Sequence, residues 1–175
     1  MKRSEVHPLP QFFDRYIGLV DDIDLVSALR HYAGFAPADL QDQLGQMADL
    51  RYAPEKWTIR DIIQHVIDNE RVQTYRALRF ARGDSTPLPG YDEQLFAAHT
   101  AANQRGLGDL LSEFECVRSS SIALFGSFDE AMMRRSGPCF GLQISVAAIG
   151  FALVGHQIHH LNVIRERYIP MLPGK

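Results

Sequence analysis

The sequence predicts an all-α protein, specifically a four-helix bundle. Apolar residues recur at helical spacing in four regions of the 175-residue chain. Segments rich in glycine and proline separate these regions, and no segment alternates strictly between apolar and polar residues as a half-buried strand does. Four long helical regions in a chain of this length favour an up-down antiparallel bundle, but the loop at 83–91 is long enough to permit a crossover, so both topologies fit the sequence.

The first helical region follows a lead-in of residues 1–23. Asp24 can cap a helix that begins at Leu25, and the apolar spacing then continues to Met47. Pro37 lies inside this region, where a proline removes one hydrogen bond and clashes with the preceding turn. A single helix kinked at Pro37 and two short helices, the second opened by Pro37, both fit the sequence. The unbroken apolar phase favours the single kinked helix.

The second region gives the clearest helix, over residues 59–82. Thr58 is its expected N-cap, Asp61 completes a weak capping box, and Gly83 suits the position after the helix. Its expected apolar face consists of Ile62, Ile63, Val66, Val72, Tyr75 and Leu78. Its arginines are interpreted as a solvated face that alternates with acids: Arg71, Arg76, Arg79 and Arg82.

Two further helical regions complete the bundle. After a turn-rich loop at 83–91, helix is expected over 92–101 and then over about 104–126. The last helix is capped by Ser145 and runs to about Tyr168, before two prolines. The whole chain, 1–175, is predicted to be one domain with a core over about 24–168.

Composition and charge exclude several classes of protein. The net charge of −3 gives no electrostatic footprint for nucleic acid or an anionic membrane. Two cysteines are too few for a disulfide framework. No run of 18 apolar residues exists, and the N-terminus lacks the pattern of a signal peptide. A cytoplasmic protein without nucleic-acid or membrane partners is therefore expected.

A histidine cluster, "GHQIHHL", lies in the last helix. His156 and His160 are spaced i, i+4, so that both rings lie on one helix face and can direct lone pairs at one cation. The same face carries apolar residues and is expected to point inward, where each histidine needs a partner. The alternative is a pair of core histidines that hydrogen-bond other groups. His159 points about 100° away around the helix, toward a neighbouring helix or solvent.

His65 strengthens the prediction of a metal site, because it borders the apolar face of the second helical region. A third imidazole aimed at His156 and His160 would give three protein ligands and an open position, the arrangement of a catalytic zinc site. Asp68, at i+3 from His65, could hydrogen-bond that ring or act as a proton carrier beside the metal. The alternative for Asp68 is a solvated helix charge.

Two segments of the sequence carry a family resemblance. "YAPEKWTIRDIIQHVIDNERVQTYRALRFARGDSTPLPGYDE" and "ISVAAIGFALVGHQIHHLNVIRERY" resemble the DinB-like (YfiT-like) metal-dependent hydrolases. The resemblance covers about 24–168, and its specific parts are Trp57, the helix with His65, the "TPLPGYDE" loop and the terminal His-x-x-x-His. It implies a four-helix bundle that holds one divalent metal ion, zinc or nickel, on residues matching His65, His156 and His160.

The resemblance also suggests what the protein does. Some relatives are S-transferases or isomerases that use low-molecular-weight thiols such as bacillithiol or mycothiol, and dimers are common. A metal-dependent enzyme that acts on a small molecule, by thiol transfer or hydrolysis, is therefore expected, and a homodimer with it. The alternative is a non-catalytic bundle that binds a metal or ligand. A DNA-binding role follows only from the family's name, and the charge balance opposes it.

Overall fold

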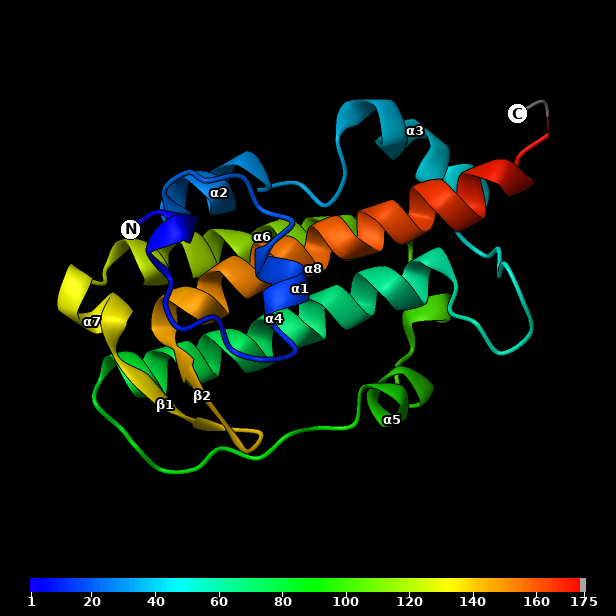
Figure 1. The fold of residues 1–175 in the computed structure, drawn as a ribbon. Coiled ribbons are helices and arrows are strands. Elements are labelled where there is room, and N and C mark those ends of the chain that lie inside the picture. The colour runs from blue at the N-terminus through cyan, green and yellow to red at the C-terminus, as the bar shows by residue number, and fades with distance from the viewer. Residues whose placement is uncertain (174–175) are drawn as a thin grey trace.

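Three long helices lie side by side through the molecule, and two shorter helices form the fourth layer (Figure 1). The long helices are α4 (Ile59–Ala81), α6 (Leu107–Gly126) and α8 (Val146–Val163), and the fourth layer consists of α2 (Leu25–His31) and α3 (Ala38–Met47). The computed structural model describes residues 1–173, so the last two residues of the predicted domain lie outside it. The predicted all-α, four-helix-bundle fold is confirmed.

Shorter elements surround the bundle. The short helices and strands are α1 (Asp14–Ile17), α5 (Glu93–Ala98), α7 (Glu130–Arg134), β1 (Ser136–Cys139) and β2 (Leu142–Ser145). Single helical turns complete the described chain at Arg3–Glu5, Ala102–Gln104 and Ile169–Met171, and α8 continues into a π-helical turn at Ile164–Tyr168. No described helix is long and apolar enough to cross a membrane.

Pro37 separates two helices and does not kink one, so the favoured prediction was wrong. Pro37 is the extended N-cap of α3, with φ −67° and ψ 158°. A proline also disfavours helical backbone in the residue before it, here Ala36, but α2 has already ended at His31. The segment between α2 and α3 is held against α8, because the Gln157 amide donates to the carbonyls of Gly34 and Phe35 at 2.7 and 2.8 Å.

Helix α4 begins and ends where the sequence indicates. The Thr58 hydroxyl accepts from the Asp61 N–H, and the Asp61 carboxylate accepts from the Thr58 N–H, which completes the capping box. Gly83 follows the helix with φ +83°. In the second half of α4, however, the predicted apolar face is wrong: Tyr75 is 54% exposed, whereas Gln73 and Arg76 are buried.

A two-stranded hairpin, β1–β2, was not predicted. Its turn places Phe140 and Gly141 at positive φ, the backbone of a two-residue hairpin turn. Leu88, in the loop after α4, donates to the Pro138 carbonyl and accepts from the Phe140 N–H. Both strands have only four residues, too few to show alternation, and β1 also contains a glycine and a proline. The hairpin fixes the loop that carries Tyr91 beside α4.

The lead-in of residues 1–23 is an integral part of the fold. It contains α1, which lies against α8 (Figure 1), and it contributes apolar residues to the core: Val6, Phe13, Ile17 and Val20. Gly155 of α8 permits the approach, because a Cβ there would lie 1.9 Å from the carbonyl oxygen of Tyr16. The N-terminal segment is thereby placed beside the histidine cluster.

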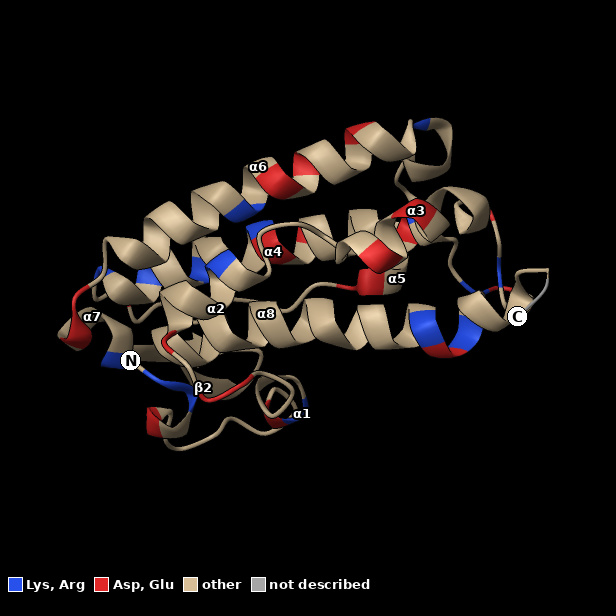
Figure 2. Ribbon diagram, turned by 90° about the horizontal axis from the view of Figure 1, so that it is seen from above, with Lys and Arg blue, Asp and Glu red and all other residues tan. Residues whose placement is uncertain are grey.

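Helix α8 lies at the centre of the core. It carries no charged residue between Val146 and Val163, whereas acidic and basic residues are interspersed on the outer helices (Figure 2). One ion pair is nevertheless fully buried beside it. Arg118 makes two hydrogen bonds of 2.8 Å with Glu70 and donates to the Gln157 amide oxygen at 2.9 Å. This cluster joins α4, α6 and α8.

Candidate metal centre

The structure brings His65 of α4 together with His156 and His160 of α8. Nε2 of His156 lies 3.0 Å from Nε2 of His65 and 3.1 Å from Nε2 of His160. The side chains are only 6, 6 and 9% exposed. Among residues 1–173, these three form the one group of His, Cys, Asp or Glu side chains close enough to share a metal ion.

The contacts between the rings are not explained by hydrogen bonding alone. A ring nitrogen carries one N–H or one in-plane lone pair, so His156 Nε2 cannot direct a good hydrogen bond at both neighbours. The three rings are also steeply inclined, at 72 to 90°. Nδ1 of His160 is buried and has no hydrogen-bond partner within the described chain.

A shared cation fits this donor set. Two nitrogens bound to one ion at about 2.1 Å lie about 3.0 Å apart at a right angle and about 3.4 Å apart at a tetrahedral angle. The two separations that involve His156, 3.0 and 3.1 Å, lie in this range, and the ligand atoms of all three histidines lie within 4.8 Å of one another. Three imidazoles suit zinc, nickel and other divalent transition metals.

Burial keeps the cluster in the protonation state that binds metals. Burial lowers the pKa of His65 to about 4, and His159 adds a smaller electrostatic effect. Burial, followed by the neighbouring histidines, lowers the pKa of both His156 and His160 well below the ordinary value. All three imidazoles are therefore neutral at pH 7, and neutral imidazole is the metal-binding form.

Aromatic side chains enclose the cluster on two sides. The Trp57 ring lies 4.7 Å from the His65 ring and 6.4 Å from the His160 ring, measured between centroids. Its backbone carbonyl accepts from the Tyr168 hydroxyl at 2.6 Å. On the other side, Tyr16 of α1 meets the His156 ring edge-on at 5.3 Å. These contacts hold the imidazole planes in place.

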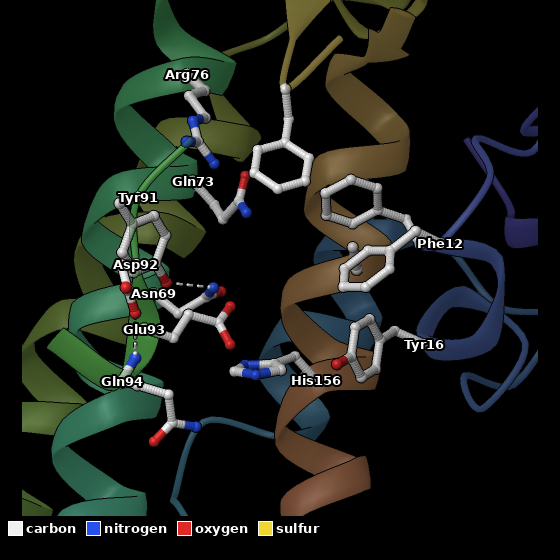
Figure 3. Close-up of a pocket in the computed structure, with 13 residues that line it drawn as sticks. Phe12, Tyr16, Asn69, Gln73, Arg76, Tyr91, Asp92, Glu93, Gln94 and His156 are labelled. Carbon is white, nitrogen blue, oxygen red and sulfur yellow. Dashed lines mark hydrogen bonds between the residues drawn. The ribbon is translucent and has the colours of Figure 1, made fainter. Parts of the chain in front are cut away.

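A pocket of about 320 Å³ opens onto His156 (Figure 3). One wall is aromatic and comes largely from the lead-in, with Phe12 and Tyr16 on the side of α8. The opposite wall is polar and comes from α4 and the loop that follows it. The full lining is Phe12, Phe13, Tyr16, Asn69, Gln73, Arg76, Tyr91, Asp92, Glu93, Gln94, Phe140, Ala152 and His156.

The polar wall presents one carboxylate to the pocket. Asp92 caps α5 by accepting from the N–H groups of Gln94 and Leu95. Glu93, at the exposed rim, points its carboxylate into the pocket on the side of His156 (Figure 3). Loss of solvation raises the pKa of Glu93, against a smaller opposing effect of Arg15. A carboxyl with a raised pKa is suited to proton transfer.

Asp68 and His159 lie away from the centre of the cluster. The Asp68 carboxylate accepts from the Gln64 amide at 2.9 Å and lines a separate hollow with Phe96 and His99. No hydrogen bond joins it to His65 in the part of the chain that the structure describes, so the hydrogen bond that the sequence allowed is not formed, while a role of Asp68 as proton carrier stays a prediction. His159 is exposed and packs its ring 5.5 Å from that of Tyr16.

Several residues at the pocket were missed by the sequence analysis. Arg76, expected on a solvated face, is only 5% exposed. A signal existed, because Asn69, Gln73 and Arg76 follow His65 at intervals of four, four and three residues, which place them on one helix face. Tyr16 and Glu93 had no comparable signal, since only tertiary structure brings them to the site.

Comparisons with known proteins agree with this fold. No curated protein matches the sequence. Among solved structures, the chain is similar to YfiT from Bacillus subtilis, described as a probable metal-dependent hydrolase with an unusual four-helix bundle topology. The two share 18% identity with a TM-score of 0.65, over 91% of this chain and 87% of that one. The DinB superfamily matches residues 27–164, which contain all three clustered histidines, and the protein is therefore a member of the DinB superfamily.

Proposed function

We propose that this protein is a divalent-metal-dependent enzyme that acts on a small molecule. The observation that carries the proposal is the convergence of three neutral, buried imidazoles beside a pocket. His65, His156 and His160 would hold one ion, zinc or nickel. When bound, the metal supplies Lewis acidity and lowers the pKa of a coordinated water or thiol.

The residues around the pocket have separate tasks. Trp57 and Tyr16 hold the imidazole planes and keep solvent from the cluster. Glu93 accepts or delivers a proton at its carboxylate, the role that sequence analysis gave to Asp68. Asn69 donates to the Tyr91 hydroxyl at 2.8 Å, which ties the loop to α4 and maintains the polar wall.

Two reaction classes are compatible with such a site. The description of YfiT as a probable metal-dependent hydrolase supports hydrolysis. The family resemblance seen in the sequence supports S-transfer from a low-molecular-weight thiol to an electrophile. We favour thiol transfer, and the two are separated by adding thiol to a reaction with an electrophilic ester. Hydrolysis proceeds without thiol and gives the acid and the alcohol. Transfer requires the thiol: attack on the acyl carbon gives a thioester and releases the alcohol, and attack on the alkyl carbon gives a thioether and releases the acid.

The first experiment measures metal content by elemental analysis of tag-free protein. Wild type is compared with His65→Ala and with His99→Ala, which removes an exposed histidine. One divalent ion per chain is expected in wild type and His99→Ala, and none in His65→Ala. Equal metal content in all three proteins would refute the site. Full turnover by metal-free protein would refute metal dependence. Metal binding without turnover of any thiol or ester substrate would instead favour the alternative, a non-catalytic metal- or ligand-binding bundle.

Homodimerisation and a cytoplasmic location stay predictions that come from the family resemblance and the sequence. Sedimentation of the purified protein tests the first. Fractionation of cells that produce it at natural levels tests the second.

A further inference from the structure

Arg76 is a buried cation without a counter-ion. Its side chain is 5% exposed, yet no Asp or Glu within residues 1–173 forms an ion pair with it. Nη2 donates to the Pro89 carbonyl at 2.6 Å, and the guanidinium lies 5.8 Å from the centre of the Tyr91 ring. Nε and Nη1 donate no hydrogen bond within the described chain. Neither nitrogen is among the fully buried atoms without a partner, and Arg76 lines the pocket, so the free donors are open to a group bound there. A charge that is largely buried and has no counter-ion is costly unless something else pairs with it.

The guanidinium reaches into one end of the pocket, and His156 lies toward the other end (Figure 3). On α4, Arg76 is eleven residues after His65, three helical turns that span about 16 Å of helix axis. Gln73 and Asn69 lie between them on the same face, and both line the pocket. The pocket is thus an elongated space with a cation at one end and the histidine cluster at the other.

The apolar wall carries two phenylalanines in an unusual backbone conformation. Phe12 has φ +77° and Phe140 has φ +58°, and their side chains are 46 and 60% exposed. At Phe140 the hairpin turn requires this backbone, whereas at Phe12 it is an uncommon conformation for a bulky residue. The Phe140 ring lies directly on Gly90, where an added Cβ would come within 2.2 Å of it. Both rings thus present apolar surface to the pocket without filling it.

We propose that the substrate is an organic acid with an apolar body. Its carboxylate pairs with Arg76, its apolar body packs against Phe12 and Phe140, and its reacting group faces His156. A carboxylate fits better than a phosphate, because one guanidinium with one edge free matches a single planar anion. Glu93 in the same pocket further disfavours a dianion. The inference rests on the proposed function in taking this pocket to be the substrate site.

The test measures binding of 4-phenylbutyrate by calorimetry, with its neutral analogue 4-phenylbutanamide as the matched ligand. Wild type should prefer the acid, and Arg76→Gln should bind the acid about tenfold to a hundredfold more weakly. Binding of the amide should not change. Arg71→Gln is the control, since Arg71 is on the same helix but pairs with Glu113 outside the pocket. Arg76→Lys keeps the charge without the planar fork and should fall between wild type and Arg76→Gln.

Melting temperatures separate a binding role from a structural one. Removal of an unpaired buried charge should leave the ligand-free Arg76→Gln protein at least as stable as wild type. The deciding measurement is the preference of wild type for the acid over the amide. If wild type bound the two ligands equally, the proposal would be overturned, whether Arg76→Gln were less stable or failed to fold.

The same titrations on metal-free protein distinguish this inference from the proposed function. If the acid binds through Arg76 but no metal binds to wild type, the metal-dependent enzyme is refuted and the carboxylate site stands. If metal binds but acid and amide bind equally, the metal site stands and the carboxylate site is refuted.

Discussion

Two buried polar clusters lie side by side along α8, and they differ in how their hydrogen-bonding groups are used. In the first, Arg118, Glu70 and Gln157 satisfy one another and the carbonyls of Tyr32, Gly34 and Phe35. In the second, three imidazole nitrogens face one another, and Nδ1 of His160 has no partner in the described chain.

Adjacent residues of one helix belong to the two clusters, since Gln157 follows His156 in sequence. Burial alone therefore does not reveal a functional site here. The first cluster is complete without any added group and joins helices. The second leaves a buried nitrogen without a partner in the described chain, and it lies at the pocket. Arg76, buried without a carboxylate, resembles the second cluster in this respect and contrasts with Arg118.

The largest expected loss of stability comes from disrupting the cluster of Arg118, Glu70 and Gln157. Glu70→Gln removes the charge that pairs with Arg118, whose side chain is 0% exposed. An uncompensated buried charge should lower the free energy of unfolding by about 3–5 kcal/mol. Urea unfolding of metal-free protein measures this.

The matched control for this variant is Glu113→Gln. Glu113 pairs with Arg71 and Arg105 near the surface, so the expected loss is at most about 1 kcal/mol. Comparable losses in the two variants would mean that the buried ion pair contributes no more to the free energy of unfolding than the pairs near the surface.

In metal-free protein, lowering the pH should destabilise the fold through the histidine cluster. In the unfolded chain His65 takes up a proton near its ordinary pKa of 6.5, but in the folded protein only near 4. The unfolded state therefore binds more protons between these values, and the free energy of unfolding falls as pH drops from about 6.5 to about 4. The loss attributable to His65 is on the order of 3 kcal/mol.

Urea unfolding of wild type and His65→Phe across this pH range isolates the effect. The wild-type free energy of unfolding should decline more steeply, since His65→Phe lacks the titrating ring, whereas shared carboxylates affect both proteins alike. Parallel pH profiles would contradict the stabilising role of the neutral His65 ring at pH 7.

A smaller effect, of opposite sign to that of Glu70→Gln, is expected for His160→Leu. This change removes a buried nitrogen without a partner, so metal-free protein should gain about 1 kcal/mol in free energy of unfolding. With metal present the order should reverse, because only wild type gains the free energy of metal binding. Thermal melts with chelator and with added zinc measure both. If His160→Leu instead lowered stability in chelator, His160 would stabilise the metal-free fold, as the cluster of Arg118, Glu70 and Gln157 does.

The fold was predictable where its signals are local. The caps at Asp24 and Thr58 and the spacing of His156 and His160 each depend on a few neighbouring residues, and the structure has them as expected. The break at Pro37 was one of two alternatives that fitted the sequence, and it was not the favoured one. The connection is held by a distant side chain, Gln157 of α8, which donates to the carbonyls of Gly34 and Phe35.

The surroundings of the site were less predictable than the histidine cluster. Tyr16 reaches His156 only because Gly155, in another helix, allows α1 to approach. Arg76 was assigned to a solvated face on which arginines alternate with acids, and arginine is in general rarely buried without a partner. That departure from the rule is what marks it as a candidate binding residue.

Asp68→Asn should have the smallest effect. Asp68 lies on α4 between His65 and Glu70 but belongs to neither cluster, since its carboxylate accepts from Gln64. Metal content and turnover should equal those of wild type, and the free energy of unfolding should change by at most about 0.5 kcal/mol. Glu93→Gln is the comparison, because its carboxylate faces the pocket and its loss should slow turnover about a hundredfold. If Asp68→Asn slowed the reaction and Glu93→Gln did not, the proton carrier would be Asp68, as the sequence first suggested.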